Sequence, residues 1–349
     1  MNVRRAFAVF GALTLTVALT AGSYAQDKNQ EQAQEQRKLS NDERREYLAL
    51  NELVDAVAAG KQSAPADVKL KFQNHFLKSN DKVYIPYILE VSGGTFTSFP
   101  VAMYIRAVKK DAAAAPAPKP DDKPIDWPFA DVYFLNEKNV TTTGGVTEVP
   151  RALALPSGEY TLYIALRERQ PKDKKQGSPK TVVLAQPLTV PDMNKGLTTS
   201  SVILAKALDP APEQLTGQQQ LEQPYTISGY RVTPTFSQVM PQTGALLFVF
   251  FIYNEGVAAS GKPDMDLEYN FFRAAEDKPF TKLAPQSFNA TTLPGQFDVK
   301  LGHQVFVGQE IPLKNEAVTF APGEYRLELK ITDKINSQTI TRIVPFTVS

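Results

Sequence analysis

Along most of the chain, hydrophobic and polar positions alternate with a period of two, and Gly, Pro, Asn or Asp residues separate the short alternating runs. Runs that are rich in β-branched and aromatic residues and bounded in this way are typical of β-strands. The expected strands of the first half are residues 83–91, 98–108, 129–135, 146–155, 159–167 and 181–190. Those of the second half are residues 201–208, 225–232, 245–253, 266–272, 296–307, 324–332 and 339–348. The pattern predicts an all-β fold in which sheets pack as β-sandwiches.

One segment near the N-terminus repeats its apolar residues at helical spacing instead, at Tyr47, Leu50, Leu53, Val54 and Val57. Ser40 and Glu43 have the spacing of a capping box, and Gly60 is a suitable C-terminal stop. The sequence therefore predicts a short amphipathic helix over residues 40–60. We expect its apolar face to pack on its own domain, and the alternative is docking in the groove of a partner.

The two halves of the chain share a repeated hairpin pattern. Residues 155–166 align with residues 320–331 at an offset of 165 residues, and both copies keep the tripeptide Gly-Glu-Tyr, which ends at Tyr160 and at Tyr325. Starting from each tyrosine, every second residue is apolar: Tyr160, Leu162, Ile164 and Leu166 in the first copy, and Tyr325, Leu327, Leu329 and Ile331 in the second. A closing strand follows each copy, at residues 186–190 and 344–348.

This order of turn, Gly-x-Tyr, alternating strand and closing strand is that of the last hairpin of an immunoglobulin-like sandwich, in which the tyrosine hydroxyl bonds back to the backbone. We therefore predict two tandem immunoglobulin-like β-sandwich domains, at residues 63–192 and 197–349. Within the first, the Ala- and Pro-rich residues 111–124 are expected to be a mobile insertion. Within the second, the Pro- and Gln-rich residues 210–223 are expected to be the least structured stretch.

The first 25 residues have the parts of a secretory signal peptide. Arg4 and Arg5 precede an apolar run over residues 6–21, and the Ser-Tyr-Ala tripeptide at residues 23–25 forms a cleavage site. The alternative, a retained membrane anchor, needs about 20 apolar residues, and this run is shorter. We expect cleavage, then a flexible polar spacer over residues 26–39, no membrane span in the mature chain, and a secreted or periplasmic location.

The composition excludes several kinds of chemistry. The 349 residues include no cysteine and only two histidines, His75 and His303. A cysteine nucleophile, a thiolate zinc site, an iron–sulfur cluster and a disulfide framework are therefore excluded. The 38 basic and 37 acidic side chains nearly balance, which argues against nucleic acid as a partner. We expect no cofactor.

Residues 256–262 follow an apolar strand and match the first seven positions of a phosphate-binding loop, including Lys262. The eighth position is Pro263, where the motif needs a hydroxyl for magnesium. The residues after it alternate with period two, whereas a phosphate loop opens a helix. We interpret this segment as a glycine-bearing hairpin connection between two strands.

Directly after it, Asp264, Asp266 and Glu268 lie at alternate positions, so that on a strand they share one face. A calcium site is the alternative to a solvated face. An extended strand spaces carboxylates too far apart for one ion, because calcium loops bend the chain around the metal. We therefore expect these three side chains to face water, and no metal site.

The two histidines and the single tryptophan are the other candidates for chemistry. His75 lies beside Phe72 and Phe76, and His303 lies in a Gly-His-Gln turn. Each is a possible general base, but no nucleophile motif accompanies either, so we expect structural or surface roles. Trp127 is expected in the core at the mouth of a strand; an exposed tryptophan would favour carbohydrate or protein recognition. No catalytic residue is predicted, and the ligand-binding residues remain unassigned.

Five runs carry a family resemblance: residues 76–87, 225–236, 285–294, 302–304 and 322–333. They resemble the region that follows the von Willebrand factor A-related domain in certain secreted bacterial proteins, and the likeness spans residues 40–349. The resemblance implies secretion and a sandwich fold but no activity or ligand. The A domain itself is absent, because the sequence has no Asp-x-Ser-x-Ser motif. Neither the metal-dependent adhesion site nor any other functional residue is carried over.

We predict a noncatalytic binding or scaffold protein of the bacterial cell envelope that engages a protein partner through loops or edge strands. The alternatives are a carbohydrate-binding surface module and an unrecognised hydrolase. Coplanar exposed aromatic side chains on one sandwich face would favour carbohydrate, and a bare hydrophobic edge would favour protein. Convergent carboxylates or a histidine with a perturbed pKa in a cleft would favour a hydrolase.

Overall fold

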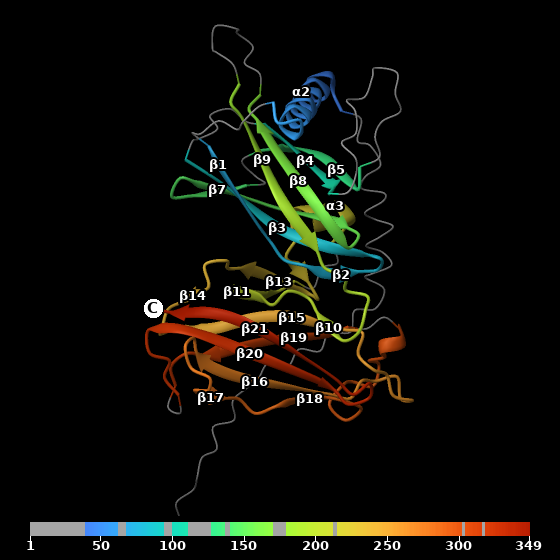
Figure 1. Ribbon diagram of the computed structural model, residues 1–349, viewed down its shortest axis with the longest axis vertical. Helices are drawn as coiled ribbons and strands as arrows, with labels where there is room; N and C mark the ends of the chain where they lie inside the picture. Colours follow the sequence, from blue (N-terminus) through green and yellow to red (C-terminus); the bar gives the residue numbers. More distant parts are fainter. Residues whose placement is uncertain are drawn as a thin grey trace, which may run out of the picture. The chain divides into compact units, whose positions relative to one another are not determined.

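The computed structural model describes residues 39–61, 68–93, 100–110, 127–136, 140–169, 179–211, 215–301, 304–315 and 318–349. These residues form mainly strands, in four sheets, with two α-helices among them (Figure 1). The prediction of an all-β sandwich fold is confirmed. The predicted signal peptide, all of the predicted spacer except its last residue, the predicted insertion and His303 lie outside the described residues.

The chain divides into an N-terminal unit and a C-terminal unit. Of the described residues, the N-terminal unit contains residues 39–194 and 215–226, and the C-terminal unit contains residues 195–211 and 227–349. This grouping differs from the two continuous domains that we expected at residues 63–192 and 197–349. The difference is the segment 215–226, which groups with the N-terminal unit although it is far downstream in the sequence.

Residues 210–223 were expected to be the least structured stretch of the second half. This is wrong for residues 217–222. Helix α3 (Gly217–Glu222) forms there. Its N-cap is Thr216, whose side chain accepts from the backbone of Gln219, and the Gln219 side chain accepts from the backbone of Thr216. This reciprocal capping offsets the weak helix propensity of a six-residue segment.

Two sheets build the N-terminal unit. The first contains β1 (Lys69–Asn74), β2 (Leu77–Ser79), β3 (Lys82–Ser92), β6 (Thr141–Thr143) and β7 (Val146–Leu155), in the order β1-β3-β7-β6 with β2 also on β3. The second contains β4 (Val101–Lys109), β5 (Phe129–Leu135), β8 (Gly158–Arg167) and β9 (Thr181–Val190), in the order β5-β4-β8-β9. All their pairings are antiparallel.

Helix α2 (Asn41–Ala58) covers the outer face of the second sheet, as Figure 1 shows beside β4 and β8. The Ser40–Glu43 capping box that the sequence predicted is present. Leu50 and Val54 are fully buried against Ala102, Tyr104, Ala165 and Val183. The expectation that this helix packs on its own domain is therefore confirmed, and the helix covers the outer face of the sheet at these residues.

Two sheets also build the C-terminal unit. The first contains β10 (Thr198–Thr199), β11 (Ile203–Pro210), β12 (Thr226–Ile227), β13 (Tyr230–Pro234), β15 (Ala245–Tyr253) and β19 (Val305–Pro312). The second contains β14 (Val239–Met240), β16 (Met265–Arg273), β17 (Thr281–Lys282), β18 (Gln286–Phe288), β20 (Gly323–Asp333) and β21 (Gln338–Val348). A core rich in phenylalanine lies between them, including Phe248, Phe250, Phe271, Phe320 and Phe346.

Three local predictions are corrected by the strand pairing. The segment after β15 is not a hairpin connection, because β15 and β16 belong to different sheets, so residues 254–264 cross from one layer to the other. The expected strand at residues 296–307 begins late, at Val305, because Asp298 accepts from the backbone of Lys300 and a 3₁₀ turn forms there. Strands β1 and β2 were not predicted.

Candidate functional site

The two predicted corner tyrosines occupy equivalent positions. The Tyr160 hydroxyl donates to the carbonyl of Pro156 at 3.0 Å, and the Tyr325 hydroxyl donates to the carbonyl of Ala321 at 2.9 Å. Both acceptors lie four residues before their tyrosine. The predicted tyrosine corner is confirmed in both units, and it serves to hold the turn before each last hairpin.

Glycine is required at the start of each corner. Gly158 has φ +145° and Gly323 has φ +152°, a conformation that residues with a Cβ rarely adopt. Tyr160 then pairs with Leu188 on β9, and Tyr325 pairs with Phe346 on β21. The repeat in the sequence therefore encodes the same backbone path twice.

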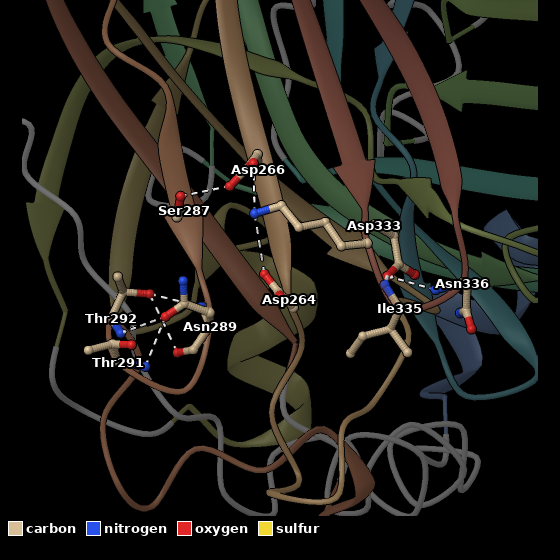
Figure 2. Close-up of polar contacts among 10 residues, drawn as sticks. Asp264, Asp266, Ser287, Asn289, Thr291, Thr292, Asp333, Ile335 and Asn336 are labelled. Atoms are coloured by element: carbon tan, nitrogen blue, oxygen red, sulfur yellow. Dashed lines mark hydrogen bonds and ion pairs between the residues drawn. The ribbon is translucent and has the colours of Figure 1, made fainter.

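The lysine of the segment that resembles a phosphate loop is engaged elsewhere. Nζ of Lys262 is buried and donates to the carbonyl of Leu293 at 2.9 Å, with the carbonyl of Ala290 at 3.5 Å. The chain continues into strand β16 and not into a helix. Lys262 therefore anchors the turn at residues 289–293, whose Asn289 caps Thr291 and Thr292 (Figure 2).

The two glycines of that segment have packing roles. A Cβ on Gly256 would lie 2.7 Å from Cβ of Ile335, and one on Gly261 would lie 2.6 Å from the carboxylate of Asp298. Gly256 N donates to Asp333 at 2.7 Å, and Asp333 is fully buried. The glycines thus allow close approach of backbone and side chain and do not form a cradle for phosphate.

Figure 2 also shows Asp264 and Asp266, two of the three alternating carboxylates at the start of β16. Asp266 accepts from Ser287 at 2.7 Å and pairs with Nζ of Lys334 at 2.8 Å, and Asp264 lies 3.5 Å from the same Nζ. Glu268 pairs with Lys330 at 2.8 Å. The hydrogen bond from Lys334, and after it that from Ser287, hold the pKa of Asp266 below its usual value. In the described part of the chain no cluster of three acidic or histidine side chains is arranged to hold a metal ion.

His75 is buried in the N-terminal unit. Its Nδ1 lies 2.9 Å from the hydroxyl of Tyr225, and the two rings meet edge to face at 5.7 Å. Burial lowers the pKa of His75 to about 4. The Tyr225 hydroxyl donates its proton to the carbonyl of Pro86 at 3.1 Å, so the neutral imidazole that carries its hydrogen on Nδ1 completes the contact. The structure assigns His75 to the attachment of the downstream segment.

The rest of that attachment is made by Tyr84 and Gln220. The Tyr84 hydroxyl donates to the carbonyl of Pro224 at 3.1 Å, and Nε2 of Gln220 donates to the Tyr84 hydroxyl at 3.3 Å. Sequence reasoning missed these residues, because 136 positions separate Tyr84 from Gln220. The aromatic residues of 76–87 are a signal for a strand and give no indication of their partner.

Trp127 is half-buried at the outer face of the second sheet and not in the core as expected. The guanidinium of Arg106 lies 4.5 Å from the centre of its ring. Arg106 is 2% exposed and pairs with Asp55 of α2 at 2.7 Å. Trp127 therefore helps to hold the arginine that anchors the helix, and its position indicates a structural role.

A second buried polar group was also missed. Tyr87 on β3, Arg151 on β7, and Asp131 and Tyr133 on β5 lie within electrostatic range of one another. Nε of Arg151 and the hydroxyl of Tyr87 are buried without a hydrogen-bond partner among the described residues. Burial raises the pKa of Asp131, and the nearby Tyr133 hydroxyl and Arg151 oppose that rise. These residues come from three strands, so no local motif marks them.

No family model and no curated protein matches the chain. Among solved structures, the chain is similar to Escherichia coli alpha-2-macroglobulin activated by porcine elastase, at 10% sequence identity and a TM-score of 0.21. That match covers 82% of this chain and 24% of the other, so the chain spans about a quarter of that protein's length. The fold assignment rests on the strand pairing itself. Within the described ranges, no helix has the length and apolarity to cross a membrane.

Proposed function

We propose that this chain is a noncatalytic binding or scaffold protein of the bacterial cell envelope, secreted or periplasmic, and that it engages a protein partner. The signal pattern in the first 25 residues and the resemblance to a region of secreted bacterial proteins support the location. The candidate chemical residues of the sequence make contacts that stabilise the fold, which supports a noncatalytic role. These residues are Lys262, His75 and the carboxylates at β16.

The chemical type of the exposed apolar side chains favours a protein partner over a carbohydrate. The large exposed hydrophobic residues of the described chain are all aliphatic: Leu48, Val239, Ile335 and Ile343. Coplanar aromatic pairs exist, such as Phe251 with Tyr253, but both rings are buried. Sugar-binding faces present exposed aromatic rings, whereas an aliphatic side chain at a sheet edge suits a protein.

Ile343, with 62% of its side chain exposed, lies on β21. Strand β14 pairs with β21 only at Thr347 and Val348, and among the described residues no strand pairs with residues 338–346 on that side. The amide of Thr347 points to β14, and backbone groups alternate between the two edges of a strand, so the amides of Thr341 and Ile343 point the same way. A partner strand can add there.

The chain offers a matched control for testing this edge. Ala185 on β9 stands where Ile343 stands on β21, one hairpin repeat earlier, and it is also exposed. A photo-cross-linking residue placed at position 343 is expected to form one discrete adduct in the native envelope that excess unlabelled protein competes away, and the same residue at position 185 is expected to form none. Ile343→Lys should weaken capture of that partner by about tenfold or more. Equal labelling from both positions, or binding on a glycan array that Ile343→Lys leaves intact, would contradict the proposal.

A further inference from the structure

The N-terminal unit binds a piece of its own chain in the way that a protein binds a peptide. Residues 215–226 come from beyond the first strands of the C-terminal unit, and Figure 1 shows α3 among the strands of the N-terminal unit. The contacts are with residues of β3 and the segment before β2, more than 130 positions earlier. Residues 215–226 therefore occupy the N-terminal unit as a covalently attached peptide ligand would.

The segment is held together by hydrogen bonds of its own. Thr226 N donates to the carbonyl of Gln223 at 3.0 Å, which closes a turn with Pro224 and Tyr225 at its centre. Nε2 of Gln220 donates to the carbonyl of Thr226 at 3.1 Å, so the short helix α3 braces the turn. A preorganised ligand loses less conformational entropy on binding.

Three residues of the N-terminal unit contact this turn through polar groups. Pro86 accepts the hydroxyl hydrogen of Tyr225, His75 contacts the same hydroxyl, and Tyr84 donates to the carbonyl of Pro224. Tyr225 is 5% exposed, and Tyr84 is 3% exposed. The contacts specify an aromatic ring, a hydroxyl at its tip, and the carbonyl of the residue before it. A phenylalanine at this position keeps the ring and the preceding carbonyl but lacks the hydroxyl.

We propose that His75, Tyr84 and Pro86 form a peptide-recognition site for a Pro-Tyr turn, that the chain's own residues 215–226 are its built-in occupant, and that a protein segment of the same chemistry can replace them. Intramolecular attachment gives the built-in occupant an effective concentration on the order of millimolar. A free peptide therefore competes poorly until the occupant is weakened. This site does not include the edge of β21, so the test of the peptide site is independent of the test of that edge.

The experiment uses the full chain and a labelled synthetic peptide of residues 215–228, with binding followed by fluorescence anisotropy. Tyr225→Ala removes the ring of the occupant and opens the site. We expect the peptide to bind this variant at least about tenfold more tightly than it binds the unmodified chain, in which the occupant competes. A peptide with phenylalanine at position 225 is expected to bind the variant about three- to tenfold more weakly, because the bond to Pro86 is lost.

Two further variants keep the test decisive. Tyr225→Phe removes only the hydroxyl, so it preserves packing if Tyr225→Ala fails to fold, and it should also admit the tyrosine peptide more readily than the unmodified chain does. Tyr230→Ala is the matched control, since Tyr230 is a half-buried tyrosine of the C-terminal unit that stacks on Phe306. It should leave peptide binding at the unmodified level. Absence of binding to natively folded Tyr225→Phe and Tyr225→Ala chains, or equal binding to every variant, would overturn the proposal.

Discussion

The closing hairpins of the two units share their inner faces and differ on their outer faces. On β8 and β20 the side chains that face the core follow the same alternation, from Tyr160 and from Tyr325, and all of them are buried. On the outer face, Tyr163 and Ala165 of β8 pack under helix α2. The equivalent residues of β20 are Glu328 and Lys330, and Lys330 forms an ion pair with Glu268.

This difference shows that the inner positions of a strand reflect the opposite sheet of the sandwich, whereas the outer positions reflect whatever covers the outer face. The inner alternation is the same because both strands close a sandwich of the same kind. The outer positions are apolar only where another layer covers them. The continuous apolar run over residues 162–166 was thus a signal that β8 is buried on two sides, and the helix at residues 41–58 is the element that covers it.

Exchanging the outer-face residues of β8 and β20 should give the largest difference in stability between the two units. Ala165→Lys places an ammonium group at a fully buried position under α2, so we expect a loss on the order of 4 kcal/mol in the free energy of unfolding, or release of the helix. Lys330→Ala should change stability by less than about 0.5 kcal/mol, because its ion pair is exposed. Urea denaturation and hydrogen exchange of the α2 amides measure both. A mild effect of Ala165→Lys with α2 still protected would contradict the covered-face interpretation.

The two corner tyrosines differ in their surroundings, and truncation should expose that difference. Tyr325 stacks on Phe346 at 5.5 Å and lies 5.1 Å from Phe320, so Tyr325→Ala is expected to cost about 4–5 kcal/mol. Tyr160 is buried but packs on no aromatic ring among the described residues, so Tyr160→Ala is expected to cost about 3 kcal/mol. Hydrogen exchange of β8–β9 and β20–β21 amides assigns each loss to its unit. A larger loss for Tyr160→Ala would show that the phenylalanine cluster adds nothing.

The pH dependence should differ between the units because of His75. Its pKa is about 4 in the folded chain and near 6.5 when unfolded. Above pH 6.5 the His75 imidazole is neutral in both states. As pH falls from 6.5 to about 4, the imidazole becomes protonated in the unfolded state but stays neutral in the folded state. Stability is therefore lost over that window, by up to about 3 kcal/mol, and His75 adds no further slope below pH 4.

The measurement is the urea midpoint of the N-terminal unit from pH 7.5 to 4, with His75→Gln as the matched variant. Subtracting the two profiles removes the contribution of the carboxylates. The difference should grow as pH falls through 6. A difference that stays constant with pH would mean that His75 is protonated equally in both states.

A small and equal loss of stability is expected when one corner hydrogen bond is removed. Tyr160→Phe and Tyr325→Phe each remove a hydroxyl that donates to a backbone carbonyl, and each should cost about 1 kcal/mol. The two costs should be nearly equal, unlike those of the alanine variants, because the bond lengths and acceptors match. Thermal melts of the full-length variants test this. If Tyr325→Phe lowered stability severalfold more than Tyr160→Phe, the two corners would not be equivalent.

Short patterns in the amino-acid sequence are sufficient to predict the class of fold, the tyrosine corners and the N-terminal helix. Each rests on a pattern within about twenty residues: period-two alternation, the Gly-Glu-Tyr repeat, and the Ser40–Glu43 capping box. Local backbone chemistry sets these features, because the partners of the capping and corner hydrogen bonds are only a few positions apart. The repeat even placed Pro187 and Pro345 at equivalent positions of the closing strands, where a residue without an amide hydrogen is tolerated near a sheet edge.

Which of those elements contact one another depends on the folding of the whole chain. The crossing of residues 254–264 between sheets, the burial of Lys262 and the attachment of Tyr225 to His75 all join residues that no local pattern relates. Lys262 and Gly256 matched a phosphate loop by type and spacing, yet their roles depend on Leu293 and Ile335, which are 31 and 79 positions downstream. The free energy of such contacts comes from burial and from satisfying polar groups in a particular neighbourhood, and the chain acquires that neighbourhood only when it folds.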